Sequence, residues 1–415
     1  MQAVIAIPET IALLSKDSAS DLLTWPVGCV PLLMRTMVTA SRAGADEILL
    51  ICSPRLSEKL VRRFTDEASQ RKIRVDVIRV KNFDPRAWSS WVILKSYLKN
   101  SFLWLPWNWV TTKKFLTNLP MVKLPSVDWD KPAHTTLREV VRDNASITLQ
   151  PEGVAVTSPE SAVAAEKFLV VHSGKVLDGI HTSFNRRLCR PFVRLLLHTR
   201  ITPNAVTLGG VFVSIFSAMA FAKGSYWWYV LGALLFYVAG LFDEMDGMLA
   251  RVKFAESPRG TWFEGFADGL SYLLLFGGIT IGLSRQYGEV AIWMGVALVV
   301  GAALAVTATS LQRKRATTPD RPQEYLGNFY KLLEKDSGNW ISRVVRQVQA
   351  FQKRGVLIIY IVVFTVLGGL PVLFFLATLG AHLTWILTLY FNRRFFSQPV
   401  QSGAKPNVST LKEAL

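Results

Sequence analysis

The stretch LFDEMDGMLARVKFAESPRGTWFEGFADGLSY, Leu241 to Tyr272, decides the fold because it sets acidic side chains between two long apolar runs. Carboxylates at membrane depth cost roughly 2.5–3.5 kcal/mol each on insertion scales, so a cluster of them there indicates a functional site. Eight residues separate the two acidic halves of the stretch. The halves read Asp243-x-x-Asp246-Gly247-x-x-Ala250-Arg251 and Gly260-x-x-x-Glu264-x-x-x-Asp268.

Six apolar runs follow residue 200, and all but the short fifth run have the roughly 17–25 residues that cross a bilayer core as a helix. Basic residues gather beside these runs, and six crossings place every basic cluster on the side that carries the four carboxylates. The positive-inside rule then puts the N-terminal part, the carboxylates and the C-terminal end in the cytoplasm. The expected spans are Pro203–Ala222, Tyr226–Phe242, Gly260–Ser284, Val290–Leu311, Val356–Gly369 and Leu370–Phe391.

The charge balance is strongly basic, with 47 Lys and Arg against 30 Asp and Glu and a formal net charge of +17. Nucleic acid is one explanation for such an excess. Here the basic residues lie next to apolar runs, and the mean hydropathy of +0.28 is high for a soluble protein. This distribution suits anionic membrane lipids better. We therefore expect membrane lipids as partners and no nucleic acid.

The first 165 residues alternate strand-like and helix-like patterns. Such alternation predicts a parallel sheet with helices on both faces, a Rossmann-like α/β domain. Gly44 is a natural end for the candidate helix Pro31–Ala43, because glycine adopts the left-handed conformation without steric cost. The strand candidates are Ala3–Ile7, Glu47–Cys52, Ile73–Val80 and Phe102–Val110, the last broken at Pro106, and the helix candidates are Pro31–Ala43 and Leu56–Gln70.

Residues 166–200 connect this domain to the apolar runs. Arg190–His198 alternates basic and apolar residues, which is typical of a helix lying in the membrane surface. An ordinary amphipathic helix on the α/β domain is the alternative. Residues 201–396 are expected to form an all-α membrane bundle of six transmembrane helices, and residues 397–415 a polar tail.

The spacing of the acids favours metal binding. Asp243 and Asp246 are three residues apart, and Glu264 and Asp268 are four apart, so each pair shares one face of a helix. Two antiparallel helices would gather all four carboxylates in one pocket. Oxygen-only ligands suit hard cations such as Mg²⁺, Mn²⁺ or Ca²⁺ rather than Zn²⁺. Four acids are enough for two ions about 3.5–4 Å apart, the arrangement used in phosphoryl displacement.

The same stretch resembles the signature of the CDP-alcohol phosphotransferase family, D-x-x-D-G-x-x-A-R-x8-G-x3-D-x3-D. Every fixed position agrees except the third Asp, which is Glu264 here. The resemblance covers about residues 178–391 and includes Pro203-Asn204-x-x-Thr207 at the start of the first span. A soluble domain followed by this membrane domain is similar to the fused cytidylyltransferase/inositol-phosphate phosphotransferases, in which one half makes CDP-inositol and the other consumes it.

The resemblance implies a role for each site residue. Two divalent ions, Mg²⁺ or Mn²⁺, would be bound by Asp243, Asp246, Glu264 and Asp268. Asp268 would also be the general base. The residues that would contact the nucleotide are Asn204, Thr207, Gly247, Ala250, Arg251 and Ser257. Arg259, Lys353 and Arg354 are the candidates for binding a phosphate on the acceptor, although Lys353 and Arg354 equally suit a positive-inside anchor. The resemblance also implies a homodimer.

The N-terminal domain resembles a sugar-phosphate nucleotidyltransferase through AVIAIP at 3–8, VGCVPLLMRTMVTASRAGADEILLIC at 27–52 and VTSPESAVAAEKFL at 156–169. The Gly-rich loop that cradles phosphates in that family is replaced by Ile7-Pro8-Glu9-Thr10. The family's lysine before Pro-Leu-Leu is Val30. Its two metal-binding acids fall near Trp107-Asn108 and Ala155–Thr157, where no acid stands. The domain is therefore expected to be catalytically degenerate.

The leading hypothesis is an integral, multi-pass membrane transferase of the prokaryotic inner membrane. It would move a substituted phosphate group from a CDP-alcohol, either a CDP-polyol or CDP-diacylglycerol, to an alcohol acceptor and release CMP, in phospholipid or polyol-phosphodiester synthesis. A bifunctional enzyme that also makes its CDP-alcohol from CTP is one alternative, and CTP turnover would identify it. A catalytically inactive membrane protein with a partner-binding head is another, and the retained carboxylates argue against it.

Overall fold

The computed structural model describes residues 1–12, 21–85, 87–119, 122–123, 152–174, 180–316, 329, 332–333, 336, 338–348 and 354–395. The chain forms two compact units. The first comprises Met1–Asp178, Arg190–Ile201 and Gly247–Ala255, and the second comprises Gly179–Cys189, Thr202–Asp246 and Glu256–Leu415. The expected polar tail 397–415 lies outside the described residues.

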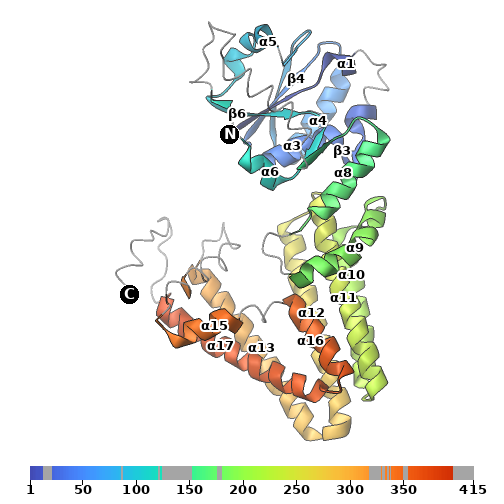
Figure 1. The fold of residues 1–415 in the computed structure, drawn as a ribbon, viewed down its shortest axis with the longest axis vertical. Helices are drawn as coiled ribbons and strands as arrows, with labels where there is room; N and C mark the ends of the chain where they lie inside the picture. The colour runs from blue at the N-terminus through green and yellow to red at the C-terminus, as the bar shows by residue number, and fades with distance from the viewer. Residues whose placement is uncertain are drawn as a thin grey trace. The chain divides into compact units, whose positions relative to one another are not determined.

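The first unit contains a five-stranded sheet in the order β5-β4-β1-β6-β8 (Figure 1). Strands β1, β4, β5 and β6 are parallel, and β8 is antiparallel to β6. All residues of β1 and β4 are buried, as expected for parallel strands whose two faces are both covered. The strands are β1 Gln2–Ala6, β4 Glu47–Cys52, β5 Arg74–Arg79, β6 Ser101–Pro106 and β8 Val122–Lys123.

Helices α3 (Leu32–Arg42) and α4 (Glu58–Gln70) connect the parallel strands. In chain order the parallel strands lie 3-2-1-4, which is the beginning of the Rossmann order. The predicted Rossmann-like α/β fold is therefore confirmed. The smaller elements are α1 Glu9–Ala12, β2 Pro26–Val27, β3 Val30–Pro31, α5 Trp88–Val92, the 3₁₀ turn η1 Lys95–Tyr97, β7 Trp109–Thr111, α6 Lys113–Asn118, β9 Gly153–Ala155 and α8 Pro159–Val171.

The strand-like run Phe102–Val110 was expected to be broken at Pro106, and the structure divides it there. Strand β6 ends at Pro106, and β7 begins at Trp109 in a separate two-stranded sheet with β9. Proline has no N–H to donate to a strand ladder, so it belongs at the end of a strand rather than inside one.

Among the residues that the structure describes, five helices of the second unit are long and apolar enough to cross a membrane. Helix α16 is shorter, with an apolar part at Leu357–Val366. The all-α membrane bundle is confirmed, with five long helices and one short helix where six spans were expected. The helices are α10 Pro203–Ala222, α11 Tyr226–Val252, α12 Pro258–Tyr287, α13 Glu289–Ala316, α15 Trp340–Val348, α16 Arg354–Val366 and α17 Leu370–Phe395.

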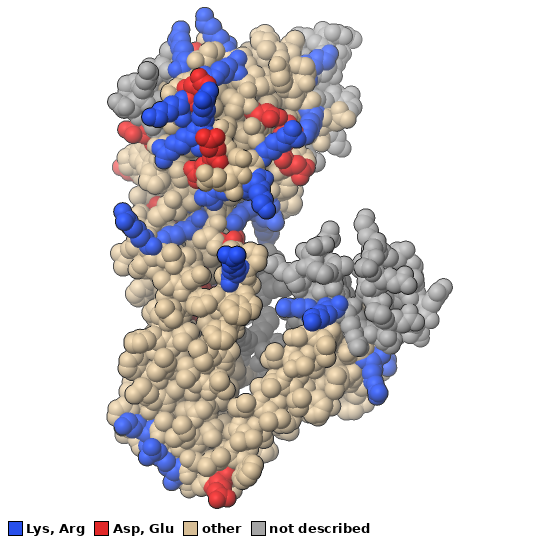
Figure 2. Space-filling model, turned by 180° about the vertical axis from the view of Figure 1, so that it is seen from behind, with Lys and Arg blue, Asp and Glu red and all other residues tan. Residues whose placement is uncertain are grey.

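The surface of the helical unit is that of a membrane protein. On the face drawn in Figure 2, its middle is almost free of charged side chains, and Lys and Arg lie near its ends. Large apolar side chains are exposed along its helices, for example Phe212 on α10 and Trp293 on α13. Exposed apolar area of this extent needs a nonpolar solvent. The protein is thus an integral membrane protein.

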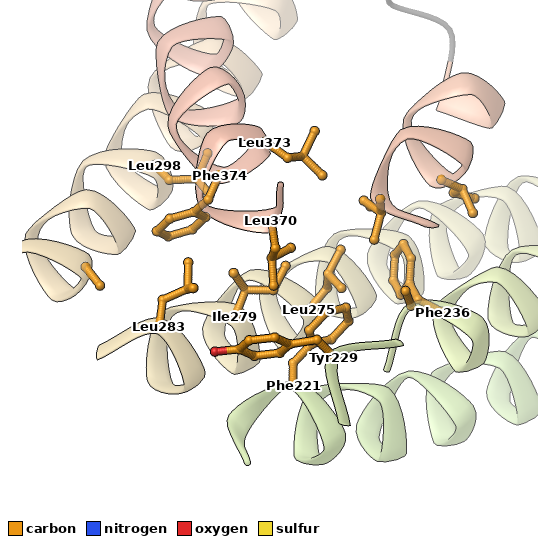
Figure 3. Close-up of a cluster of buried hydrophobic side chains, with 14 residues drawn as sticks. Phe221, Tyr229, Phe236, Leu275, Ile279, Leu283, Leu298, Leu370, Leu373 and Phe374 are labelled. Carbon is orange, nitrogen blue, oxygen red and sulfur yellow. The ribbon is translucent and has the colours of Figure 1, made fainter. Parts of the chain in front are cut away.

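Within this unit, helix α10 packs along α12, and helix α13 packs along α17 (Figure 1). One cluster of buried apolar side chains draws on six helices (Figure 3). Its members include Phe221 of α10, Tyr229 and Phe236 of α11, Leu275 of α12, Leu298 of α13, Ile361 of α16 and Phe374 of α17.

Helix α9 (Ile180–Leu197) precedes α10 and has an exposed apolar face. Phe184, Leu188, Phe192 and Leu195 recur at helical spacing and are all exposed. Arg187 and Arg194 lie on the same helix. This pattern supports the prediction of a helix in the membrane surface, which remains a prediction.

Two glycines of α12 allow it to approach α10 closely. A Cβ at Gly278 would lie 2.5 Å from the Ala218 carbonyl oxygen, and a Cβ at Gly282 would collide with the Phe221 carbonyl oxygen. Small residues four apart let helix backbones meet in this way in membranes. A Cβ at the neighbouring Gly277 would meet nothing within 4 Å.

We expect Gly278→Ala to lower the free energy of unfolding by about 1–3 kcal/mol, because α10 and α12 must separate. Gly277→Ala is the matched control. It should leave stability unchanged or raise it by up to about 1 kcal/mol, since alanine favours the helix. Thermal unfolding of the purified protein in detergent measures both. Equal midpoints for the two variants would contradict the close packing of α10 on α12.

Candidate metal centre in the helical unit

Three carboxylates from two helices meet in the second unit. Asp243 and Asp246 lie near the end of α11, and Glu264 lies in the second turn of α12. One carboxylate oxygen of each lies within 4.8 Å of the others. Asp246 is buried, and the other two are half-buried. Three negative charges this close repel strongly away from bulk water, so a bound cation would stabilise them.

The fourth predicted acid, Asp268, lines a cavity beside this cluster. The cavity has a volume of about 40 Å³ and is also lined by Asp243 and Asp246. A water needs roughly 10–15 Å³ of such volume, so there is room for a small ion with some of its water. Oxygen donors around a small polar cavity fit Mg²⁺ or Mn²⁺. The structure thus brings three acids together and puts Asp268 on the wall of the adjoining cavity.

Thr207 of α10 contacts the acidic cluster directly. Its hydroxyl donates a hydrogen bond to Oδ2 of Asp246, and both side chains are buried. A donor to a carboxylate fixes its orientation, as the outer partners of metal ligands do. Thr207 therefore orients Asp246, a role that was not predicted for it.

Asn204 and Ser257 lie beside the start of α12. The Ser257 hydroxyl accepts a hydrogen bond from Gly260 N–H at 3.0 Å, which caps the helix. A Cβ at Gly260 would lie 3.1 Å from Ser257 Oγ and 3.7 Å from Asn204 Oδ1. The two polar side chains thus flank the same glycine, and both are exposed to solvent.

The N-terminal half of α9 is fixed to α11 next to the acids. Arg186 Nε lies 3.3 Å from Glu244 Oε2, and Tyr237 donates to Asn185 Oδ1 at 2.9 Å. Glu244 stands between Asp243 and Asp246 in the sequence but is paired with Arg186 instead of joining the cluster. Helical geometry explains this, because adjacent residues on a helix point in different directions.

Gly247, Ala250 and Arg251 continue α11 beyond the acids, in the segment that belongs to the first unit. A Cβ at Gly247 would lie 3.1 Å from Nη1 of Arg251. The glycine therefore gives the guanidinium room to lie along the helix. Arg251 Nε also donates to the Ser173 carbonyl oxygen just after α8.

The three candidates for binding the acceptor phosphate remain predictions. Arg259 is exposed in the first turn of α12, and Arg354 is the first residue of α16. Lys353 lies outside the described residues.

Sequence reasoning missed three polar residues of the cavity, Ser214, Ser271 and Tyr272. Ser214 follows Thr207 by seven residues, and Ser271 follows Asp268 by three. Residues three or seven positions apart lie on the same face of a helix, so this periodicity was the signal that could have identified Ser214 and Ser271.

The first unit brings together the two segments, near Trp107-Asn108 and Ala155–Thr157, at which the resemblance to nucleotidyltransferases places metal-binding acids. Two hydrogen bonds of 3.0 and 2.9 Å join these segments at Asn108 and Val156. They provide an amide and a valine. Glu9, just after β1, accepts a hydrogen bond from Asn82 N–H at 2.6 Å. A carboxylate at the carboxyl end of β1 repels phosphate, which would bind there in a Rossmann-like sheet.

The family model described as CDP-alcohol phosphatidyltransferase matches residues 200–390. Among curated proteins, the chain is 25% identical over 237 residues to a bifunctional IPC transferase and DIPP synthase of Aquifex aeolicus, covering 57% of this chain and 49% of that protein. It is 31% identical over 91 residues to cholinephosphotransferase 1 of Gallus gallus, covering 20% of this chain and 27% of the relative.

A third relative is a phosphatidylinositol phosphate synthase of Mycolicibacterium smegmatis, 30% identical over 95 residues, which are 23% of this chain and 41% of that synthase. The match thus spans about half the length of the first relative and less of the other two. The similarity to the Aquifex aeolicus protein extends over more of this chain than the matches to the other two.

Proposed function

We propose, from the premise that residues 200–390 form a CDP-alcohol phosphatidyltransferase domain, that this membrane protein transfers a substituted phosphate group from a CDP-alcohol to an alcohol acceptor and releases CMP. The observation that carries the proposal is the meeting of Asp243, Asp246 and Glu264 within 4.8 Å at the signature positions. Acids beside apolar helices indicate a functional site, and a set of oxygen donors suits hard divalent cations.

We propose that the acidic cluster holds two divalent ions, Mg²⁺ or Mn²⁺, with Asp268 completing the ligand set. When bound, such ions neutralise the pyrophosphate of the donor and stabilise CMP as it leaves. Thr207 holds the carboxylate of Asp246 in one orientation. Asp243 is half-buried and lines the cavity, and Glu264 is half-buried.

Asp268 is proposed as the general base. Its carboxylate would accept the proton of the acceptor hydroxyl while the hydroxyl oxygen attacks the phosphorus attached to the donor alcohol. The bond from that phosphorus to the CMP oxygen then breaks, so one phosphodiester forms as the pyrophosphate link is lost. The place of Asp268 on the cavity wall, one turn after Glu264, supports this role.

The donor nucleotide is proposed to contact Asn204, Thr207, Gly247, Ala250, Arg251 and Ser257. Exposed Asn204 and Ser257, which flank Gly260, suit recognition of a polar base or sugar. The Arg251 guanidinium is a natural partner of a phosphate because it presents several N–H donors in one plane.

The acceptor is proposed to be a polyol phosphate. The support is the similarity to the Aquifex aeolicus bifunctional protein, which covers 57% of this chain. Arg259, Lys353 and Arg354 are the cations proposed for the acceptor phosphate. A homodimer, a cytoplasmic active site and a prokaryotic inner-membrane location complete the proposal, and the basic residues beside the apolar runs support the cytoplasmic side.

The N-terminal domain, residues 1–165, is proposed not to transfer nucleotides itself. Amide and valine side chains at positions 108 and 156, and the carboxylate of Glu9 after β1, support this. The 166–200 junction and the 201–396 membrane domain remain the proposed division of the rest.

The proposed function is tested by mass spectrometry of lipids and polar metabolites from cells with and without the gene. The expected result is the loss of one phosphodiester and the accumulation of its CDP-alcohol. Unchanged lipids and phosphodiesters would contradict the proposal.

Glu264 is the position where the signature is altered, and two substitutions separate its charge from its length. We expect Glu264→Gln to reduce CMP release by about 10²-fold or more, because a neutral amide binds a divalent cation weakly. Glu264→Asp keeps the charge but shortens the side chain by about 1.5 Å, one carbon–carbon bond. It should retain activity within about tenfold and change the ratio of Mg²⁺- to Mn²⁺-supported rates. Full activity of Glu264→Gln would exclude Glu264 from the metal site.

A further inference from the structure

The end of α11 has an uncommon backbone conformation. Phe254, two residues after the helix, has φ +53°. Its N–H donates to the Arg251 carbonyl oxygen at 3.4 Å, and Ala255 N–H donates to the Ala250 carbonyl oxygen at 2.9 Å. These two bonds form the Schellman motif that ends many helices. The motif falls inside the eight-residue link between the two halves of the acidic signature.

In the part of the chain that the structure describes, three other helices end with the same pair of hydrogen bonds. The left-handed residue is Gly44 after α3, Gly368 after α16 and Lys72 after α4. Glycine is usual there because a side chain is strained in the left-handed region, and a bulky aromatic residue is an outlier. Phe254 therefore needs contacts that hold it in place.

Two guanidinium groups of α3 supply those contacts. Arg35 Cζ lies 4.7 Å and Arg42 Cζ lies 4.6 Å from the centre of the Phe254 ring. Both distances are within the range at which a cation is attracted to the face of an aromatic ring. Helix α3 of the α/β unit thus holds the side chain of Phe254 in place through these two contacts.

Arg35 is itself fixed by hydrogen bonds. Its side chain is buried, and Nε donates to the Val27 carbonyl oxygen at 2.9 Å. Nη2 donates to the Val252 carbonyl oxygen at 2.8 Å, at the last residue of α11. Burial lowers the pKa of the Arg35 guanidinium to about 9, so the group stays charged at neutral pH. A buried charge keeps its partners because losing them is costly.

Neighbouring residues of the link are tied to the same unit. Lys253 Nζ donates to the carbonyl oxygens of Leu196, Thr199 and Ile201 at 3.2, 3.1 and 3.0 Å. Four consecutive residues, 251 to 254, therefore each make a contact within the first unit: Arg251 with Ser173, Val252 and Phe254 with Arg35, and Lys253 with the end of α9.

We propose that the α/β unit is a positioning element for phosphotransfer. Arg35 and Arg42 contact the ring of Phe254 and so fix the end of α11. Gly247 and Arg251 are thereby held in the arrangement that binds the donor nucleotide. Arg35, Arg42 and Phe254 are positioning residues, since they act through Arg251. This inference rests on the proposed function. It gives the N-terminal domain a use that requires no nucleotidyl transfer of its own.

The test uses the full-length protein in detergent and four variants. Phe254→Gly removes the ring but relieves the backbone strain, so the protein should unfold at the same temperature or higher. We expect the KM for the CDP-alcohol to rise about tenfold with kcat changed less than threefold. Amide hydrogen exchange in residues 247–255 should become at least tenfold faster. Phe254→Tyr keeps the ring, so its KM, kcat and amide exchange should each stay within about twofold of those of the original protein. Arg35→Lys loses the planar guanidinium group, so its KM should resemble that of Phe254→Gly.

Lys72→Gly is the matched control, because it relieves the same kind of backbone strain at the end of α4 and leaves the contacts of Arg35 and Arg42 with Phe254 unchanged. It should leave KM and the exchange of residues 247–255 unchanged. If the original protein releases CMP and Phe254→Gly keeps its KM and its slow exchange, the positioning role is overturned while the proposed function stands. If Phe254→Tyr is impaired as much as Phe254→Gly, the ring contact is likewise not the cause. If the original protein releases no CMP, the proposed function itself is contradicted.

Discussion

Asp268→Asn is expected to reduce CMP release by about 10²–10⁴-fold, the range contributed by a general base. Asparagine is nearly the same size and remains polar, but it cannot accept the proton of the acceptor hydroxyl. Asp268 lines the cavity beside the three clustered acids, so the substitution leaves Asp243 and Asp246 on α11, two of the other proposed metal ligands, in place. The decisive measurement is the rate of CMP release at saturating donor, acceptor and Mg²⁺.

The control for Asp268→Asn is Gly269→Ala, a substitution at the next residue of α12. A Cβ at Gly269 would meet nothing within 4 Å, so activity should stay within about twofold. Both variants should unfold at the temperature of the original protein. Full activity of Asp268→Asn would remove Asp268 from the role of base.

Asp246→Asn is expected to lower CMP release by at least about 10³-fold, equal to about 4 kcal/mol of transition-state stabilisation. Asp246 is the buried member of the acidic cluster, and its orientation is fixed by Thr207. Replacing its charge by an amide weakens cation binding while keeping the shape of the side chain. Removal of divalent cations with EDTA should abolish the activity of the original protein, and Mg²⁺ or Mn²⁺ should restore it.

Glu244→Gln is the matched control for Asp246→Asn, because Glu244 is two residues away on α11 and is paired with Arg186 outside the cluster. Partly exposed ion pairs contribute little, so activity should stay within about fivefold. Restoration of Asp246→Asn by raised Mg²⁺ alone would point to weakened ion affinity as its defect. Activity of the original protein in EDTA would contradict a metal-dependent mechanism.

Much of the architecture followed from patterns that are local in the sequence. Apolar length predicted the helices of the membrane domain, and α10 begins and ends where the run Pro203–Ala222 does. Continuous apolar runs predicted the buried strand β4 over Glu47–Cys52. Features set by partners distant in the chain were missed. Strand β8 is two residues long and exists only through its pairing with β6.

The candidate site was predictable where chemistry and spacing coincide. Acids three or four residues apart had to share helix faces, and Asp243, Asp246 and Glu264 do meet. The hydroxyl of Thr207 on Asp246 joins two helices, so no spacing within one helix predicts it. Nor does any local pattern connect Arg35 with Phe254, which are brought together by the packing of α3 on the end of α11.

The most direct test of the central claim is CMP release by the purified protein, measured by chromatography with a CDP-alcohol, a polyol-phosphate acceptor and Mg²⁺. The donor is supplied either as a CDP-polyol or as CDP-diacylglycerol. The account predicts that CMP and a new phosphodiester form in equal amounts, and that both require the acceptor, the cation and the carboxylate of Asp268. Absence of CMP with either donor, or CMP release that Asp268→Asn leaves unchanged, would contradict it.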